Sequence, residues 1–327
     1  MKGVRRYIVG IALSVIGGLG LFLYGMNIMA RGLEKSAGRR LNRLIGILTT
    51  NRFRATLVGA VVTMIMQSSS ATTVMVIGFV NAGLMTLTQA VGLIMGANIG
   101  TTITAQMIAL DLNDYGPIAV GIGVGFWSIY SKGKMKNIAE VLVGFGVLFL
   151  GIDMMSLGLS PLSNNPVFIS AISNLNNPIL GVIAGAVLTT ILQSSSAAIG
   201  LLQALAGEGL LSMSITFPIL FGENIGTTTT GLLSTIGANV TAKRVAIVHF
   251  LFNLIGTIIF MSILRYPVEL MVMAISPNNI QSQIANAHSL FNIINVLIQL
   301  PFADLLVKAA EKLVPEKENE EIKSSIY

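Results

Sequence analysis

The sequence predicts an all-α polytopic membrane protein made of two inverted-topology repeats, with re-entrant QSSS hairpins and broken NIGTT helices. Three observations favour this fold class. Only 10% of the 327 residues are charged, against roughly 25% in soluble domains, and 53% are hydrophobic. Long stretches contain no Lys, Arg, Asp or Glu, and about 20 apolar residues cross a bilayer. The same polar motifs occur twice, and they are followed by segments of opposite charge.

Composition also excludes several classes of function. The absence of cysteine excludes disulfides, thiolate metal sites and a cysteine nucleophile, and two histidines are too few for a His-rich metal cage. The formal net charge of +6 comes from Lys and Arg clusters between apolar segments, so we expect no nucleic-acid partner. The apolar run 7–29 is too long for a signal-peptide core and predicts a retained first helix.

An internal repeat organises the chain. Residues 56–104 and 182–230 share 19 identities in 49 ungapped positions, at an offset of 126. QSSSA at 67–71 falls on QSSSA at 193–197, and the NIGTT segment 96–104 falls on 222–230. Upstream, the glycines at 18, 20 and 25 align with those at 144, 146 and 151. This duplication is typical of secondary transporters.

The charge of the connectors indicates that the halves are inverted. The connector 30–55 holds seven basic residues and one acidic residue, whereas its counterpart 156–180 holds no charge. The first is therefore predicted to be cytoplasmic and the second not. After the NIGTT motifs the bias reverses, since the acidic segment 111–114 follows the first copy and a Lys-Arg pair at 243–244 follows the second. Three basic residues near the N-terminus leave the side of that end open.

These patterns divide the chain into four parts. The first repeat is predicted at 1–134, with a hairpin at 56–82, a broken helix at 89–110 and a span at 116–134. The second is predicted at 135–264, with a hairpin at 181–208, a broken helix at 215–238 and a span at 245–264. Residues 265–307 are predicted to form an outer loop and the last transmembrane helix, and 308–327 a cytoplasmic tail.

Each QSSS motif lies within an apolar segment of about 26 residues. Serine hydroxyls compete for backbone carbonyls and are poorly placed against lipid, so we expect a helix break at the tip of a re-entrant hairpin. Serine packing between helices is the alternative. The matched second copy disfavours that alternative, because packing alone does not require the same tetrapeptide twice.

The NIGTT motifs place two glycines around an asparagine, which permits local unwinding. Thr101-Thr102 and Thr227-Thr228 would then begin half-helices whose free N–H groups form an anion site. The alternative is that the glycines serve close helix packing. Neither 56–104 nor 182–239 contains Lys or Arg, so a bound anion would meet only hydroxyls, amides and helix ends. A co-bound hard cation such as sodium would supply the missing charge and couple the two ligands.

The paired motifs, followed by HFLFN at 249–253, closely resemble the type II sodium-dependent phosphate cotransporters and their bacterial relatives, over about 18–302. The resemblance implies a cell-membrane symporter that imports inorganic phosphate with sodium by alternating access, with no other cofactor. It places phosphate at Ser68, Ser69, Ser70, Ser194, Ser195, Ser196, Thr102 and Thr228. It places sodium at Gln67, Gln193, Asn98, Asn224, Thr101 and Thr227. The expected partners are phosphate, sodium and the lipid bilayer, and a homo-oligomer is left open.

Three features depart from that pattern. Glu223 stands in the second NIGTT motif where the first has Ala97; it is added to the sodium ligands, with a proton carrier or a solvated side chain as alternatives. The first half lacks the HxxFN pattern, and a second copy occurs at 288–292. Many bacterial relatives add a C-terminal PhoU-like cytosolic domain, and regulation through such a domain is left open here.

Two other functions are weighed. An intramembrane serine hydrolase is disfavoured, because no GxSxG elbow is present and no His or Lys base occurs in the aligned segments 56–104 and 182–230, so we expect no enzyme. A passive or proton-coupled oxyanion transporter or channel remains the alternative.

Overall fold

The computed structural model describes residues 2–38 and 51–316, and every regular element in these two ranges is helical. The helices long and apolar enough to cross a membrane are Val9–Ala37, Leu87–Ala109, Lys134–Asn164, Val240–Ile275 and Ile280–Leu313. A sixth candidate is the pair Pro166–Asn176 and Pro178–Leu192, bent by 108°. The predicted all-helical, multi-pass class is therefore confirmed.

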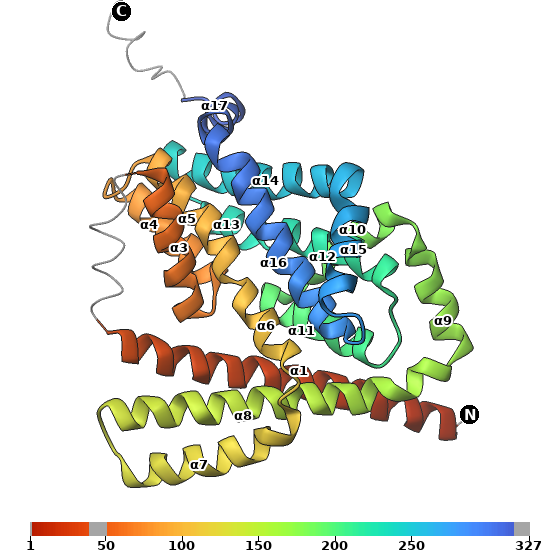
Figure 1. The fold of residues 1–327 in the computed structure, drawn as a ribbon. Coiled ribbons are helices and arrows are strands. Elements are labelled where there is room, and N and C mark those ends of the chain that lie inside the picture. The colour runs from red at the N-terminus through yellow and green to blue at the C-terminus, as the bar shows by residue number, and fades with distance from the viewer. Residues whose placement is uncertain (1, 39–50, 317–327) are drawn as a thin grey trace, which may run out of the picture.

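The helices form a layer and a larger body. The layer consists of α1 (Lys2–Ala37), α7 (Gly116–Ile129) and α8 (Lys134–Leu159), which lie side by side at the bottom of Figure 1. The body above it holds the remaining helices, including both QSSS segments. The layer therefore provides one wall against which the polar motifs lie.

Glycines bring α1 and α8 together in antiparallel orientation. A Cβ on Gly25 would lie 2.6 Å from the carbonyl oxygen of Gly144, and a Cβ on Gly144 would lie 2.6 Å from that of Gly25. Gly18 and Gly151 form the equivalent pair. Small residues permit such backbone contact between apolar helices. The glycines that align in the sequence thus meet in reciprocal pairs, 25 with 144 and 151 with 18.

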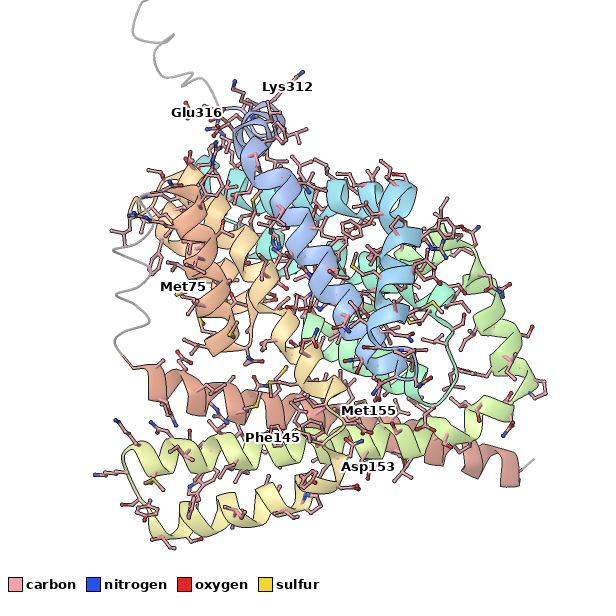
Figure 2. All side chains as sticks on the ribbon, in the orientation of Figure 1. Met75, Phe145, Asp153, Met155, Lys312 and Glu316 are labelled. Atoms are coloured by element: carbon pink, nitrogen blue, oxygen red, sulfur yellow. The ribbon has the colours of Figure 1, made fainter. Side chains whose placement is uncertain are left out.

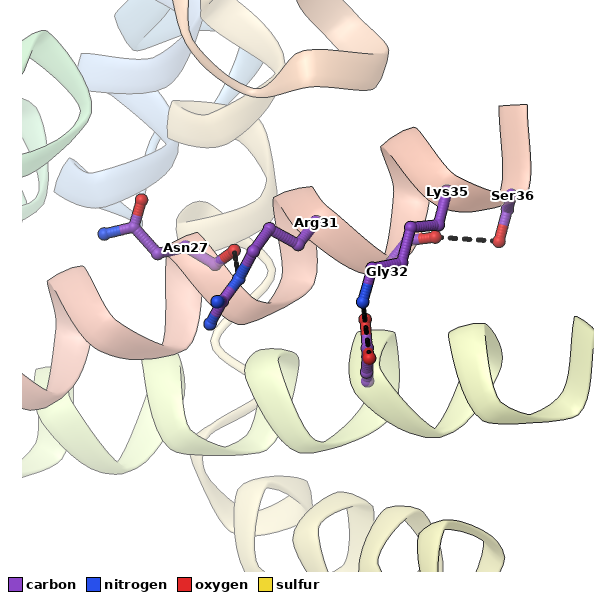
Figure 3. Close-up of polar contacts among 6 residues, drawn as sticks. Asn27, Arg31, Gly32, Lys35 and Ser36 are labelled. Carbon is purple, nitrogen blue, oxygen red and sulfur yellow. Dashed lines mark hydrogen bonds and ion pairs between the residues drawn. The ribbon is translucent and has the colours of Figure 1, made fainter. Parts of the chain in front are cut away.

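The C-terminal end of α1 is held to α8 by an ion pair. Lys35 Nζ lies 2.7 Å from both carboxylate oxygens of Glu140, which is buried, and Arg31 Nε donates to the Asn27 carbonyl oxygen at 3.3 Å (Figure 3). The first residues of the basic connector therefore continue α1. Residues 39–50 of that connector lie outside the described residues, and its last residues begin α3 (Arg52–Met66).

Both QSSS motifs form a sharp turn between two helices. The pairs are α3 (Arg52–Met66) with α4 (Ser69–Asn81), and α10 (Pro178–Leu192) with α11 (Ser195–Gly207). Gln67 and Gln193 adopt the left-handed conformation, with φ 52° in each. Ser68 and Ser194 then cap the next helix, each accepting a hydrogen bond from the N–H three residues later, at 3.1 and 3.2 Å. The predicted helix break is present at both motifs.

The structure of the NIGTT segments differs from the predicted one. They join α5 (Leu87–Gly100) to α6 (Thr102–Ala109), and α12 (Met213–Gly226) to α13 (Thr228–Ser234). Thr101 and Thr227 are right-handed helical, and their N–H groups donate to Ala97 O at 3.1 Å and Glu223 O at 3.0 Å. The expected unwinding with free N–H groups was therefore wrong.

Local hydrogen bonds explain why these segments stay wound. Thr102 Oγ1 donates to Ile99 O at 2.8 Å, and Thr228 Oγ1 donates to Ile225 O at 2.7 Å. The polar side chains are thus satisfied by their own helix. The glycines serve packing, since a Cβ on Gly96 would overlap the Thr56 carbonyl of α3. The packing alternative is the correct one.

The C-terminal part contains more helix than predicted. Its elements are α14 (Val240–Ile259), the π-helical η4 (Phe260–Leu264), α15 (Arg265–Ile275), α16 (Ile280–Gln299), η5 (Leu300–Phe302) and α17 (Ala303–Leu313). The outer loop predicted from residue 265 was wrong, because 265–275 is α15. Pro267 stands at the start of α15, directly after the π-helical η4 of the continuous helix Val240–Ile275.

The predicted tail also begins as helix, since α17 extends to Leu313, and 317–327 lie outside the described residues. Lys312 and Glu316 lie at the far end of the body from α8, which carries Asp153 (Figure 2). Arg52 Nη1 pairs with Asp304 at 3.0 Å, and Arg244 Nη1 with Glu316 at 3.5 Å. These ion pairs hold α17 against the start of α3 and α14.

Four short elements complete the fold. These are η1 (Asn113–Tyr115), η2 (Ser160–Asn164), α9 (Pro166–Ser173) and η3 (Asn174–Asn176). In the body, Phe221 stacks on Phe291 with ring centroids 5.1 Å apart, and both rings contact Phe260. This buried cluster joins α12 to α16 and thereby places the second NIGTT segment.

Candidate functional site

The two QSSS turns line one cavity of about 250 Å³ beside α1. Its lining residues are Leu23, Met26, Asn27, Ala30, Met66, Gln67, Ser68, Ser69, Ser70, Gln193, Ser194, Ser195 and Ser196. Two motifs that lie 126 residues apart in sequence thus share a single polar space. None of these lining side chains carries a charge.

The helix starts predicted at the NIGTT segments occur instead at the QSSS turns. The first backbone hydrogen bond of α4 runs from Thr72 N–H to Ser68 O, and that of α11 from Ala198 N–H to Ser194 O. The N–H groups of Ser70 and Ala71 lie in the first turn of α4, and those of Ser196 and Ala197 lie in the first turn of α11. Since α4 and α11 both begin at the cavity, two positive helix ends converge on it.

The six serines predicted for phosphate all line the cavity, but their hydroxyls differ. Ser68 and Ser194 act as helix caps. Ser69 Oγ is buried and has no hydrogen-bond partner among the described residues. Ser195 Oγ lies 3.5 Å from Thr101 Oγ1. Ser69 thus has a buried hydroxyl without a protein partner.

The two threonines predicted for phosphate do not line the cavity. Thr102 and Thr228 are buried, and their hydroxyls donate to backbone carbonyls of their own helices. The wound NIGTT segments hold both threonines outside the lining. A contact with an anion in this cavity would require them to leave those carbonyls.

The predicted sodium residues separate into two groups. Gln67 and Gln193 line the cavity, and their Oε1 atoms accept from Thr104 and Thr230, each at 2.9 Å. The others are buried behind the lining: Asn98, Asn224, Thr101, Thr227 and Glu223. Both asparagines donate to the carbonyl four residues earlier, at 2.8 and 2.9 Å. Hydroxyl and amide oxygens therefore dominate this region, and such ligands suit a hard cation.

Glu223 is a buried acid without a basic partner. Glu223 lies within α12 and is 3% exposed, and its Oε1 has no hydrogen-bond partner in the described part of the chain. Thr189 on the neighbouring α10 also has a buried hydroxyl for which the described residues supply no hydrogen-bond partner. An isolated buried carboxylate is costly, so this position favours a bound cation or proton.

Two sets of residues near the cavity were not predicted. The first set is a largely apolar wall of the cavity with one amide, formed by four residues of α1: Leu23, Met26, Asn27 and Ala30. Only the tertiary packing of α1 brings them to the cavity. Asp153, which aligns with Asn27, lies on α8 and is not part of the lining (Figure 2).

The second unpredicted set is the threonine pair that bonds the glutamines, Thr104 and Thr230. Their signal was present in the sequence, because they are the last identical pair of the aligned NIGTT segments.

The cavity is covered unequally at its two ends. Gln67 is 4% exposed, whereas its counterpart Gln193 is exposed. The α1 helix contacts α3 of the first turn, but no comparable contact joins α8 to α10 among the described residues. The two halves thus share local geometry and differ in their surroundings.

Comparison with known proteins supports a specific family. A family model described as "Na+/Pi-cotransporter" matches residues 21–157 and 166–276. The uncharacterized protein YqeW of Bacillus subtilis is 30% identical over 297 residues, which cover 90% of this chain and 96% of that protein. No solved structure matches.

Two other relatives have names that refer to phosphate. The "putative inorganic phosphate export protein YjbB" of Salmonella typhimurium is 27% identical over 306 residues, which cover 93% of this chain but 56% of YjbB. The human "sodium-dependent phosphate transport protein 2C" is 42% identical over 97 residues, covering 28% of this chain and 16% of that protein. The chain therefore spans about half the length of YjbB.

Proposed function

The chain belongs to the Na+/Pi-cotransporter family, and from that membership we propose that it is a sodium-coupled symporter that imports inorganic phosphate by alternating access. The family is one of transporters. The observation that carries the proposal is the shared cavity, in which both QSSS turns and two helix N-termini meet without a charged side chain.

The phosphate ion would lie between the two serine turns. Each helix start contributes roughly half a positive charge, and the serine hydroxyls supply further hydrogen-bond donors. Inorganic phosphate carries about one and a half to two negative charges near neutral pH, by analogy with phosphate esters. Two helix ends therefore fall short of neutralising it. The lining supplies no Lys or Arg to close this gap.

Sodium would close that gap. Gln67 and Gln193 are the proposed ligands nearest the anion, and Asn98, Asn224, Thr101, Thr227 and Glu223 are those behind the lining. Binding of either ion then raises the affinity for the other, since linkage is reciprocal. Glu223 would add a fixed negative charge to the second half alone, because the first half has Ala97 at the equivalent position.

We propose inverted-topology repeats as the architecture behind this site. The reciprocal glycine pairs of antiparallel α1 and α8 support a two-fold relation between the halves. The α3–α4 and α10–α11 hairpins would enter the membrane from opposite sides, with their turns near its centre. Positive-inside bias favours a cytoplasmic side for Arg52, Lys134 and the C-terminus, and with α1 antiparallel to α8 the N-terminus would then lie outside.

The name of YjbB favours a second candidate, in which phosphate leaves the cell. The same cavity would serve either direction, because the ion gradients determine the direction of net transport by a coupled carrier. A passive or proton-coupled oxyanion pathway is the remaining alternative.

Uptake into proteoliposomes distinguishes these functions. We expect labelled phosphate to accumulate when sodium is high outside, and to leave preloaded vesicles when the sodium gradient is reversed. Equal fluxes with sodium and with potassium would reject sodium coupling. Phosphate binding at zero and at saturating sodium provides the matched equilibrium measurement, and equal affinities would also contradict the proposal.

A further inference from the structure

Thr104 connects the two QSSS turns through one hydroxyl. Its Oγ1 donates to Gln67 Oε1 at 2.9 Å and accepts a hydrogen bond from Ser196 Oγ at 3.4 Å. The residue is completely buried. Because a hydroxyl has one proton and two lone pairs, this geometry uses the donor toward one turn and an acceptor toward the other.

The equivalent residue of the second half makes only one of these two contacts. Thr230 Oγ1 donates to Gln193 Oε1 at 2.9 Å, as Thr104 does to Gln67. No hydrogen bond joins Thr230 to Ser70, the counterpart of Ser196, in the described part of the chain. The threonine–glutamine bond within a half is therefore present in both halves, whereas the threonine–serine bond between the halves is present once.

The surroundings of the two hairpins also differ. Gln67, whose turn is joined to the other half through Thr104, is buried, whereas Gln193 is exposed. On α11, the ring of Phe22 would lie 3.0 Å from a Cβ on Gly200, while the equivalent Val74 on α4 is 39% exposed. The cross-contact and the burial thus favour one orientation of the hairpins against α1.

From this relation, which rests on the proposed alternating access, we infer that Thr104 is a positioning residue that joins the two serine turns in one orientation of the protein. In the opposite orientation, Thr230 makes the equivalent contact with Ser70. The two threonines act through the turns and do not contact the ions themselves. Exchange of one cross-contact for the other would change which end of the cavity is covered.

Double electron–electron resonance on the reconstituted full chain tests this inference. Spin labels are attached at Leu84→Cys, in the loop between α4 and α5, and at Ser131→Cys, between α7 and α8; both residues are exposed and lie outside the cavity lining. The chain has no other cysteine, so only these positions are labelled. The label distances report how the first hairpin lies against the layer.

Thr104→Val removes the hydroxyl at nearly constant volume, and we expect it to lower the population of the orientation described above by roughly three- to tenfold, as for one lost neutral hydrogen bond. Thr230→Val should shift the populations in the opposite direction. The double variant should return toward the parent, and Thr104→Ser should retain the parent distribution. General loss of packing would not give opposite signs.

Shifts of the same sign in the two valine variants, or no shift in Thr104→Val, would overturn the inference. These measurements contain neither phosphate nor sodium. A negative result would therefore leave the proposed symport standing, and symport fails separately if vesicle uptake is independent of sodium.

Discussion

Thr101 Oγ1 lies 3.5 Å from Ser195 Oγ, so that a threonine of the first NIGTT motif contacts a serine of the second QSSS motif. The two residues are 94 positions apart and come from different halves. A bound anion at Ser195 and a cation at Thr101 would therefore be immediate neighbours. This contact gives coupling between the two proposed ions a direct physical route.

Removal of a cavity hydroxyl should weaken phosphate binding. Ser69→Ala eliminates a buried hydroxyl that has no hydrogen-bond partner among residues 2–38 and 51–316, so we expect a ten- to hundredfold loss of phosphate affinity, which corresponds to about 1.5–3 kcal/mol for a hydrogen bond to a charged group. Apparent sodium affinity should fall as well. Equilibrium binding measures both. Ser128→Ala, on α7 outside the cavity, is the control and should bind as the parent does.

Replacement of the buried acid should separate the two ions. Glu223→Gln keeps the shape but removes the charge, and we expect sodium affinity to fall more than phosphate affinity at saturating sodium. Sodium titrations of uptake and binding provide the measurement. Unchanged sodium dependence with a flattened pH profile of uptake would instead assign a proton to Glu223.

The reciprocal glycine contacts should be sensitive to one added methyl group. Gly25→Ala and Gly144→Ala each place a Cβ 2.6 Å or less from the opposing backbone, so we expect a loss of about 1–3 kcal/mol of stability. Gly20→Ala is the matched control in the same helix, because no atom lies within 4 Å of its added Cβ. Thermal unfolding in detergent compares them. Equal midpoints for all three would contradict this packing.

Two ion pairs of different burial should differ in strength. Lys35→Met leaves the buried Glu140 without its partner and should cost about 1–3 kcal/mol, allowing for the half-exposed lysine. Asp304→Asn breaks the exposed pair with Arg52 and should cost at most about 1 kcal/mol. Denaturation curves measure both variants. An equal or larger effect of Asp304→Asn would refute the comparison.

The proposed topology makes a labelling prediction. A single cysteine at Ser131 should react with an impermeant maleimide only after the membrane is opened, whereas one at Asp114 should react in intact cells. Both residues are exposed and the chain has no background cysteine. Labelling of both from the same side would reject the proposed orientation of α7.

Local sequence was sufficient for the class and for the two turns. Few charges and long apolar runs require helices in a membrane, because each helix satisfies its own backbone groups. The repeated Gln-Ser-Ser-Ser places a serine N-cap directly after a residue that ends the preceding helix, so the breaks at Gln67 and Gln193 follow from short-range hydrogen bonds.

Contacts between distant segments decided the rest. The glycines of the NIGTT motifs are compatible with unwinding or with packing, and only the approach of α3 to Gly96 selects packing. The wall of the cavity from α1, and the bond from Thr104 to both turns, likewise join residues that no local pattern relates. A sequence pattern specifies which hydrogen bonds a helix can make within itself, whereas the partner of a buried hydroxyl depends on which helix packs beside it.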